Sequence, residues 1–373
     1  MRAHVLSPEQ HAVLRAVARC RTPALGGHVD VCDDCGHAVV AYNSCRDRHC
    51  PKCQALSQAR WIEKRMERVL PTHAFHVVFT LPSELHGLVM VNREKLFDLL
   101  FASAAEALLE LGRDPRWIGG ILGITSVLHT WTRDLRFHPH VHCIVTGGGL
   151  SLDGERWIAT RPGFLLPVRV LGALFRGKFL AGLSRLYDRG ELRLDGPAAK
   201  LADRAQFARV RDKLYRVRWV VYAKPPFGGP TEVFRYLGRY THRVGISNRR
   251  LVSLDERGVT FRTRGDHTAT LAPDEFLRRF LLHVLPKGYV KIRHHGLMAA
   301  SNVNTRLAAA RRLLDTTPPP TSPNTTAPRD FREVLLALTG IDLRRCPSCG
   351  ALAIRRLPLP LRPTSAPAPY DTS

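Results

Sequence analysis

The stretch Phe137-His138-Pro139-His140-Val141-His142-Cys143-Ile144-Val145-Thr146 does most to decide how this chain folds. Successive side chains of a β-strand point to opposite faces, so the three histidines share one face while Val141, Cys143 and Val145 point into a core. Imidazoles bind metals, but they are also ordinary residues at strand ends. The run alone therefore leaves a metal site and a solvated edge strand as equal alternatives.

A tyrosine pair about a hundred residues downstream favours the metal site. Tyr236 and Tyr240 lie in the segment 231–243, which has a helical composition. Residues four apart share one face of a helix, with Cβ atoms about 5–6 Å apart. An isolated pair of this kind more often packs its rings into a core. Flanking polar residues argue against a wholly buried face here: Arg235, Arg239, His242 and Arg243.

The histidine strand and the tyrosine segment together resemble the HUH endonucleases, in which two histidines around one hydrophobic residue hold a divalent metal. Within that superfamily the chain is most similar to rolling-circle transposases with two tyrosines and an N-terminal zinc domain. The resemblance covers about residues 26–295. It rests on the order of several motifs: Cys45-Arg46-Asp47-Arg48-His49-Cys50-Pro51-Lys52-Cys53, Phe79-Thr80-Leu81-Pro82, the histidine strand, and Tyr240-Thr241-His242-Arg243 before Ile246-Ser247-Asn248.

This resemblance implies roles for particular residues. His140 and His142 would be the metal-binding motif, and Tyr236 and Tyr240 the nucleophiles. For a third ligand we favour His242 over His138 and Glu232. A bound Mg or Mn ion would polarise a nonbridging phosphate oxygen. A tyrosine would then take the 5′ end of the cut DNA strand and free a 3′ hydroxyl.

The charge of the chain indicates nucleic acid as its partner. The sequence has 56 Lys and Arg against 32 Asp and Glu, a formal net charge of +24. Between Asp203 and Arg250 there are twelve Lys or Arg and three Asp or Glu. Such density favours binding to a phosphate backbone. The residues we expect to contact DNA, mainly single-stranded element ends and target, are Arg46, Arg48, Arg235, Arg239 and Arg243.

The cysteines predict structural zinc. Cys32-x2-Cys35 and Cys50-x2-Cys53 are separated by fourteen residues, a spacing typical of a zinc ribbon with four thiolates. Left over as further candidate ligands are Cys20, His28, Cys45 and His49. Cys346-x2-Cys349 is half a site at best, unless another ligand pair approaches it. Six of nine cysteines within the first 53 residues suit metal thiolates in a reducing compartment.

Strand and helix patterns interleave without a regular βαβ repeat, which predicts an α+β fold. We expect an HUH nuclease domain with a central, largely antiparallel sheet flanked by helices, after a small zinc-ribbon-like domain. Apolar periodicity predicts strands at 75–81 and 118–131, and one long helix at 83–112 capped by Ser83. The link 132–136 turns the chain into the histidine strand, so we expect an antiparallel hairpin of 118–131 with that strand.

Four segments are expected along the chain. Residues 1–70 form a zinc-binding, DNA-binding domain and residues 71–315 the catalytic domain. Residues 316–329 are a Pro/Thr-rich linker, and residues 330–373 a tail with a lone Cys-x2-Cys pair.

Several functions remain open from sequence. The leading one is a transposase that nicks and rejoins single-stranded DNA. The alternatives are a non-catalytic zinc-ribbon DNA-binding protein and a rolling-circle replication initiator; a metallohydrolase of small substrates fits the positive charge poorly. No apolar run is long enough to span a bilayer and no signal-peptide core is present, so we expect a cytoplasmic, nucleoid-associated protein without membrane contact.

Overall fold

A computed structural model of the chain describes residues 6–66, 68–224, 245–314, 330, 332–333, 335–336 and 340–359. The segment 231–243, with its two tyrosines, lies outside these ranges. Within them every helix is too short or too polar to cross a lipid bilayer.

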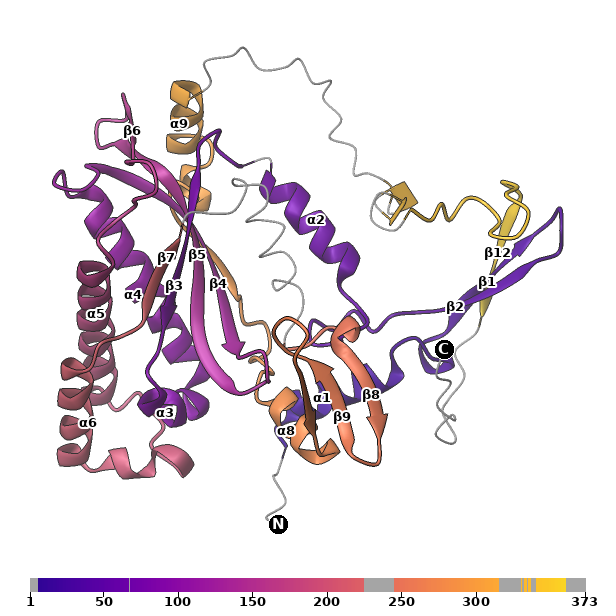
Figure 1. Ribbon diagram of the computed structural model, residues 1–373, viewed down its shortest axis with the longest axis horizontal. Helices are drawn as coiled ribbons and strands as arrows, with labels where there is room; N and C mark the ends of the chain where they lie inside the picture. Colours follow the sequence, from indigo (N-terminus) through magenta and orange to yellow (C-terminus); the bar gives the residue numbers. More distant parts are fainter. Residues whose placement is uncertain are drawn as a thin grey trace.

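An antiparallel sheet forms the centre of the molecule (Figure 1). Its hydrogen-bonded order is β11-β4-β5-β3-β7, and β6 pairs with β5. Every one of these pairings is antiparallel, which confirms the predicted α+β fold. The strands are β3 (Ala74–Thr80), β4 (Gly120–Trp131), β5 (Phe137–Ser151), β6 (Trp157–Ala159), β7 (Val221–Lys224) and β11 (Ile292–Gly296).

Helices cover one face of this sheet and bury the main core against it. In Figure 1, α4 (Arg93–Arg113), α5 (Val168–Asp188) and α6 (Arg204–Arg216) all stand on one side of the strands. Phe79 of β3 packs its ring on Phe175 of α5, with centroids 4.9 Å apart. Both rings are fully buried in a cluster of aliphatic and aromatic side chains. The opposite face of the sheet buries apolar residues in part, such as Val127 and Ile144, and elsewhere it can carry polar groups.

The helix expected over residues 83–112 is interrupted. Ser83 starts a short 3-10 turn without capping it, and α3 (His86–Val91) ends before α4 begins. The break is at Asn92, which has φ −125° and ψ 40°. Its buried side-chain amide donates to the carbonyls of Leu88 and Arg193 and accepts from the Arg193 N–H. A polar side chain that bonds to backbone in this way competes with the helical ladder, which apolar periodicity alone does not reveal.

Two smaller sheets lie outside the central one. The sheet β10-β9-β8 packs with α1 (Pro8–Arg19) and α8 (Pro273–Leu281) around Phe261. A second small sheet has the order β12-β1-β2 and joins the two ends of the sequence. The remaining elements are β1 (Gly27–Cys32), β2 (Ala38–Tyr42), α2 (Ala55–Met66), β8 (Leu251–Asp255), β9 (Gly258–Arg262), β10 (Thr268–Leu271), α9 (Arg306–Leu314) and β12 (Ile354–Leu359), with 3-10 turns at Pro23–Leu25, Ser83–Leu85, Gly196–Ala202, Asn248–Arg250 and Ala300–Asn302.

Replacing Asn92 by alanine tests the helix break. The Asn92→Ala change removes three hydrogen bonds and leaves the backbone groups of Arg193 without them, at a cost of about 2 kcal/mol. We expect a lower urea midpoint with an unchanged slope. Glu94→Ala, at an exposed position two residues along, is the matched control and should change stability by less than about 0.5 kcal/mol.

Candidate active site and metal centres

The histidine strand is β5, and from His140 on its alternation is as the sequence predicts. Before His140 the pairing with β4 shifts register between Trp131–Phe137 and His129–His140, so His138 does not join the other two histidines as expected. Val141, Cys143 and Val145 are fully buried in the core beneath the helices. His140 and His142 consequently lie on the opposite face of the sheet. They are oriented by strands that the apolar residues anchor, so their positions do not depend on a loop.

A third histidine comes from the neighbouring strand β4. His129 is the direct cross-strand partner of His140. Ligand nitrogens of His129, His140 and His142 all lie within 4.8 Å of one another. The ring centroids of His129 and His142 are 4.2 Å apart. The sequence analysis did not name His129, although the predicted hairpin placed it opposite the histidine run.

Each β5 histidine has one ring nitrogen engaged away from the cluster. His140 Nδ1 donates to the carbonyl of His138 at 2.6 Å, since a carbonyl can only accept. That bond fixes the proton on Nδ1 and leaves the lone pair on Nε2. His142 Nδ1 lies 2.7 Å from Nε2 of His76, a residue of β3. Outer contacts of this kind orient the ligands of metal sites.

Burial favours the neutral form of these rings. It lowers the pKa of His140 and of His76 to about 4. The pKa values of His129 and His142 fall well below the usual range for the same reason, with neighbouring imidazoles adding repulsion. At neutral pH all four rings are therefore uncharged, which is the state in which an imidazole can bind a metal. Three imidazoles suit manganese or other transition ions better than magnesium.

The other expected members of this site are only partly described. Tyr236, Tyr240 and His242 lie outside the described residues, as do Arg235, Arg239, Arg243 and Glu232. The ring of His138 lies against His86 and 5.2 Å from His140, and His138 is not one of the clustered ligands.

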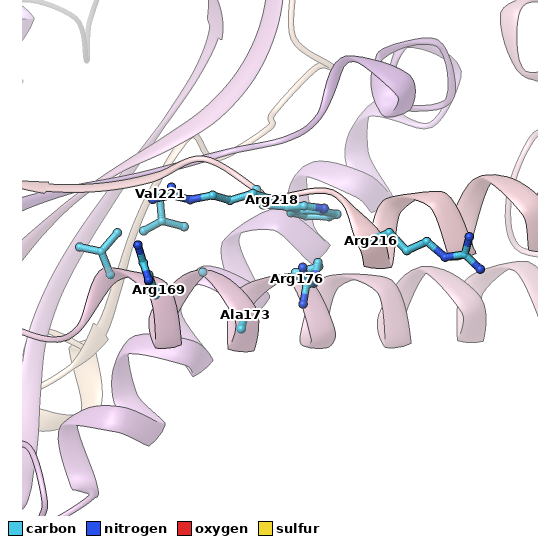
Figure 2. Close-up of a pocket in the computed structure, with 9 residues that line it drawn as sticks. Arg169, Ala173, Arg176, Arg216, Arg218 and Val221 are labelled. Carbon is cyan, nitrogen blue, oxygen red and sulfur yellow. The ribbon is translucent and has the colours of Figure 1, made fainter.

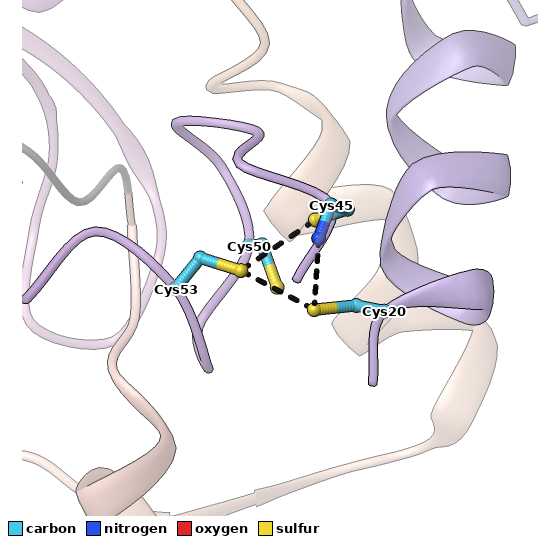
Figure 3. A group of neighbouring side chains, drawn as sticks. All are labelled: Cys20, Cys45, Cys50 and Cys53. Atoms are coloured by element: carbon cyan, nitrogen blue, oxygen red, sulfur yellow. Dashed lines mark hydrogen bonds between the residues drawn. The ribbon is translucent and has the colours of Figure 1, made fainter. Parts of the chain in front are cut away.

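A cluster of four cysteines lies beside the central domain (Figure 3). Its members come from the end of α1, the segment after β2 and the turn before α2: Cys20, Cys45, Cys50 and Cys53. Cys20 and Cys53 have sulfurs 3.2 Å apart, and Cys45 and Cys53 have sulfurs 3.7 Å apart. A closed set of four thiolates is the arrangement of a structural zinc site.

This grouping differs from the single site expected for Cys32, Cys35, Cys50 and Cys53. The first pair stands at the tip of the β1–β2 hairpin, whereas Gly27 and Tyr42 pair at its base, near Cys20 and Cys45. Strands of five or six residues span about 17–20 Å. The residues between the two Cys-x2-Cys pairs form this hairpin, so the pairs lie at its opposite ends. Cys32 and Cys35 meet Cys346 and Cys349 instead.

The two histidines left over from the zinc motif lie outside the cysteine cluster, and Arg46 and Arg48 differ in their surroundings. His49 is buried; its Nδ1 contacts Asp47 and its Nε2 accepts from the Leu285 N–H. His28 lies beside Asp30. Arg48, expected to bind DNA, donates to the carbonyls of Pro286 and Tyr289 and so ties this module to the central domain. Arg46 is exposed.

Arginines also gather around a cavity of about 270 Å³ between α5 and the edge strand β7 (Figure 2). Arg169 and Arg176 come from α5, and Arg216 and Arg218 from the end of α6 and the segment that follows. The lining contains no acidic residue. Four guanidinium groups without a carboxylate make a cavity suited to a phosphate or a similar anion.

The known proteins that match this chain are transposases. A family model described as "Putative transposase" (Y2_Tnp) matches residues 123–306, which include the three clustered histidines. A second, described as "Transposase zinc-binding domain", matches residues 1–81. "Putative transposase y4qJ" of Sinorhizobium fredii (strain NBRC 101917 / NGR234) is 46% identical over 374 residues, 99% of this chain and 94% of that protein. "Transposase for insertion sequence element IS801" of Pseudomonas savastanoi pv. phaseolicola is 29% identical, covering 89% and 80%. No solved structure matches.

Manganese titration distinguishes a ligand from a neighbour in the histidine cluster. We expect His129→Gln to weaken Mn²⁺ binding more than about 100-fold, because it removes a ligand. His76→Phe should weaken it about 10–100-fold through loss of the outer contact. His138→Gln is the matched control. It keeps the backbone carbonyl that orients His140 and should change the affinity by less than about threefold. Electron paramagnetic resonance of free Mn²⁺ gives the dissociation constants, and equal affinities for all three variants would contradict the assignment.

Proposed function

The chain belongs to this family of transposases with an N-terminal zinc-binding domain, and from that premise we propose that it nicks and rejoins single-stranded DNA through 5′-phosphotyrosine intermediates. In this proposal the reaction drives rolling-circle transposition of an insertion sequence. The work would be done on nucleoid DNA in the cytoplasm.

One observation carries the proposal: three neutral imidazoles converge on one face of the sheet, from two adjacent strands. Nitrogens that share one ion at about 2.1 Å lie roughly 3–3.5 Å apart, so small ring rotations bring this cluster to bonding distance. The Nδ1–H of His140 is already committed to a carbonyl, which turns its Nε2 toward ligation. If these histidines had only a packing role, nothing would require the Nε2 of His140 to be left free for a ligand.

Each of the chain's own groups would have a defined part in the reaction. His129, His140 and His142 would hold Mn or Mg, which supplies polarisation of a nonbridging phosphate oxygen when bound. The hydroxyl of Tyr236 or Tyr240 would lose its proton and attack the phosphorus. The new bond joins tyrosine to the 5′ phosphate; the bond that breaks releases the 3′ oxygen, which takes up a proton. Rejoining is the reverse reaction with another 3′ hydroxyl.

The arginine-lined cavity supports a path for the DNA strand near the sheet. It lies at the β7 edge, on the side of the sheet that α5 covers. β7 pairs with β3, whose His76 lies on the other side with His142, so a strand held in the cavity would pass around this edge to reach the histidines. Phosphate contacts by arginine position a strand without reading its sequence. We propose that Arg169 and Arg218 hold backbone phosphates of the strand beside the cut.

Substituting the tyrosines tests the covalent step. The double change Tyr236→Phe with Tyr240→Phe should abolish a labelled protein–DNA adduct formed from single-stranded element ends and Mn²⁺, while DNA binding is retained. Tyr215→Phe, at an exposed tyrosine of α6, should leave the adduct at the level of the unmodified protein. The adduct is read on a denaturing gel. Its persistence in the double variant would exclude both tyrosines as nucleophiles.

Salt dependence tests the arginine cavity. If Arg169 and Arg218 each neutralise one phosphate, replacing both by alanine should reduce the slope of log affinity against log salt by about 1.4 for single-stranded DNA. Arg204→Ala is the control, because Arg204 pairs with Asp188 and lies outside the cavity lining. An unchanged slope in the double variant would remove the cavity from the DNA path.

A further inference from the structure

We propose that Cys32, Cys35, Cys346 and Cys349 bind a second zinc ion, so that residues from both ends of the sequence close one metal site. Their four sulfurs lie within 4.8 Å of one another. Cys32 and Cys349 have sulfurs 3.6 Å apart, and Cys35 and Cys346 have sulfurs 3.7 Å apart. Four thiolates at 2.3 Å around tetrahedral zinc have sulfurs about 3.8 Å apart. The observed separations match that value.

Each cysteine pair forms the same turn. Gly36 and Gly350 follow the two pairs, and both have a positive φ, 69° and 78°. The Gly36 N–H donates to the Cys32 carbonyl at 2.9 Å, and the Gly350 N–H donates to the Cys346 carbonyl at 2.9 Å. The N–H groups of Cys32 and Cys346 each donate to the backbone carbonyl of the residue five positions later in the sequence. Two matching turns that bring their cysteines toward one another are typical of a shared metal site and are not expected for unrelated cysteines.

The strands next to these turns bring the distant segments together. β12 pairs with β1 in antiparallel register from Gly27↔Leu359 to Cys32↔Ile354. Arg356 forms a two-pronged ion pair with Asp30, both distances 2.7 Å, and Arg355 lies 3.1 Å from Asp33. The C-terminal segment is thus a strand of the zinc module, where the sequence analysis expected a tail with half a site.

This small sheet has almost no hydrophobic core of its own. Cys32 is the one buried residue in β1, β2 and β12, and Val39 and Val40 are 41% and 52% exposed. A sheet that buries so little cannot be stabilised by apolar contacts. Metal binding supplies folding free energy to such modules. The second ion would therefore hold the hairpin and the C-terminal strand in one unit.

The proposal accounts for every cysteine of the chain. Of nine cysteines, four belong to the cluster of Figure 3, four to this second site, and the ninth is Cys143 in the central core. The rival chemistry is a pair of disulfides, Cys32 with Cys349 and Cys35 with Cys346. A disulfide requires sulfurs about 2.05 Å apart, shorter than either observed separation, and two disulfides do not require all four sulfurs to meet at one point.

Zinc content per chain is the first test. The protein purified without chelator should hold two zinc ions, and the double variant Cys346→Ala with Cys349→Ala should hold one. Cys32→Ala with Cys35→Ala should also hold one, and Cys143→Ala, the control, should keep two. Two ions in either double variant, or one in the unmodified protein, would overturn the proposal. So would a native mass lighter by four hydrogens than the reduced mass, which indicates two disulfides.

A cleavage experiment keeps the question open to test even if those variants fail to fold. A protease site inserted between Ser322 and Pro323 allows the chain to be cut after purification. With zinc bound, the C-terminal fragment should stay with the body on gel filtration, and removal of zinc by a chelator should release it. Cys349→His, which preserves a ligand, should retain the fragment, and Cys349→Ala should release it. Release in the presence of zinc, or retention after metal analysis shows none, contradicts the proposal.

Discussion

The pairing of β4 with β5 is the constraint on which the candidate active site depends. A short turn joins these strands: the Thr132 N–H donates to the Arg136 carbonyl, and Leu135 adopts a positive φ of 63°. This turn and a register shift between the Trp131–Phe137 and His129–His140 pairs together place His129 opposite His140. A slip of one residue would send the imidazoles into the core and the valines out of it. The buried apolar side of β5 thus specifies the geometry of its polar side.

This dependence explains how much of the site could be predicted. The alternation in 137–146 predicts the strand and its two faces, and the link 132–136 predicts the turn before it. The strand and the turn are observed, and the two faces are as expected from His140 on. His129 was also within reach, because continuing the predicted hairpin places it beside His140. The helix break at Asn92 could not be predicted, because it depends on hydrogen bonds to the backbone of Arg193, about a hundred residues away in sequence. Local patterns predict elements well, but they do not predict bonds made across the fold.

The cysteines illustrate the same limit. The spacing of Cys32, Cys35, Cys50 and Cys53 is that of one ribbon site, and spacing carries no information about a strand pair that separates the two halves. In the structure the sulfur of Cys35 lies 3.7 Å from that of Cys346, which is beyond the Pro/Thr-rich stretch 316–329. Only the pairing of β12 with β1 brings these residues together. Motif counting therefore indicated zinc without indicating which thiolates share an ion.

The electrostatic setting favours histidines over carboxylates as ligands in the proposed reaction. Neutral imidazoles add no negative charge, so they leave the full charge of a bound cation to act on a phosphodiester. To bind a cation, each ring must stay uncharged in a chain with a net charge of +24. Burial ensures this, because it lowers the pKa of His140 to about 4. Burial also lowers the pKa of Lys291, whose charge acts on His129, to about 7, and repulsion from Arg48 adds to the shift. The Lys291 ammonium therefore loses its proton more readily than an exposed lysine does.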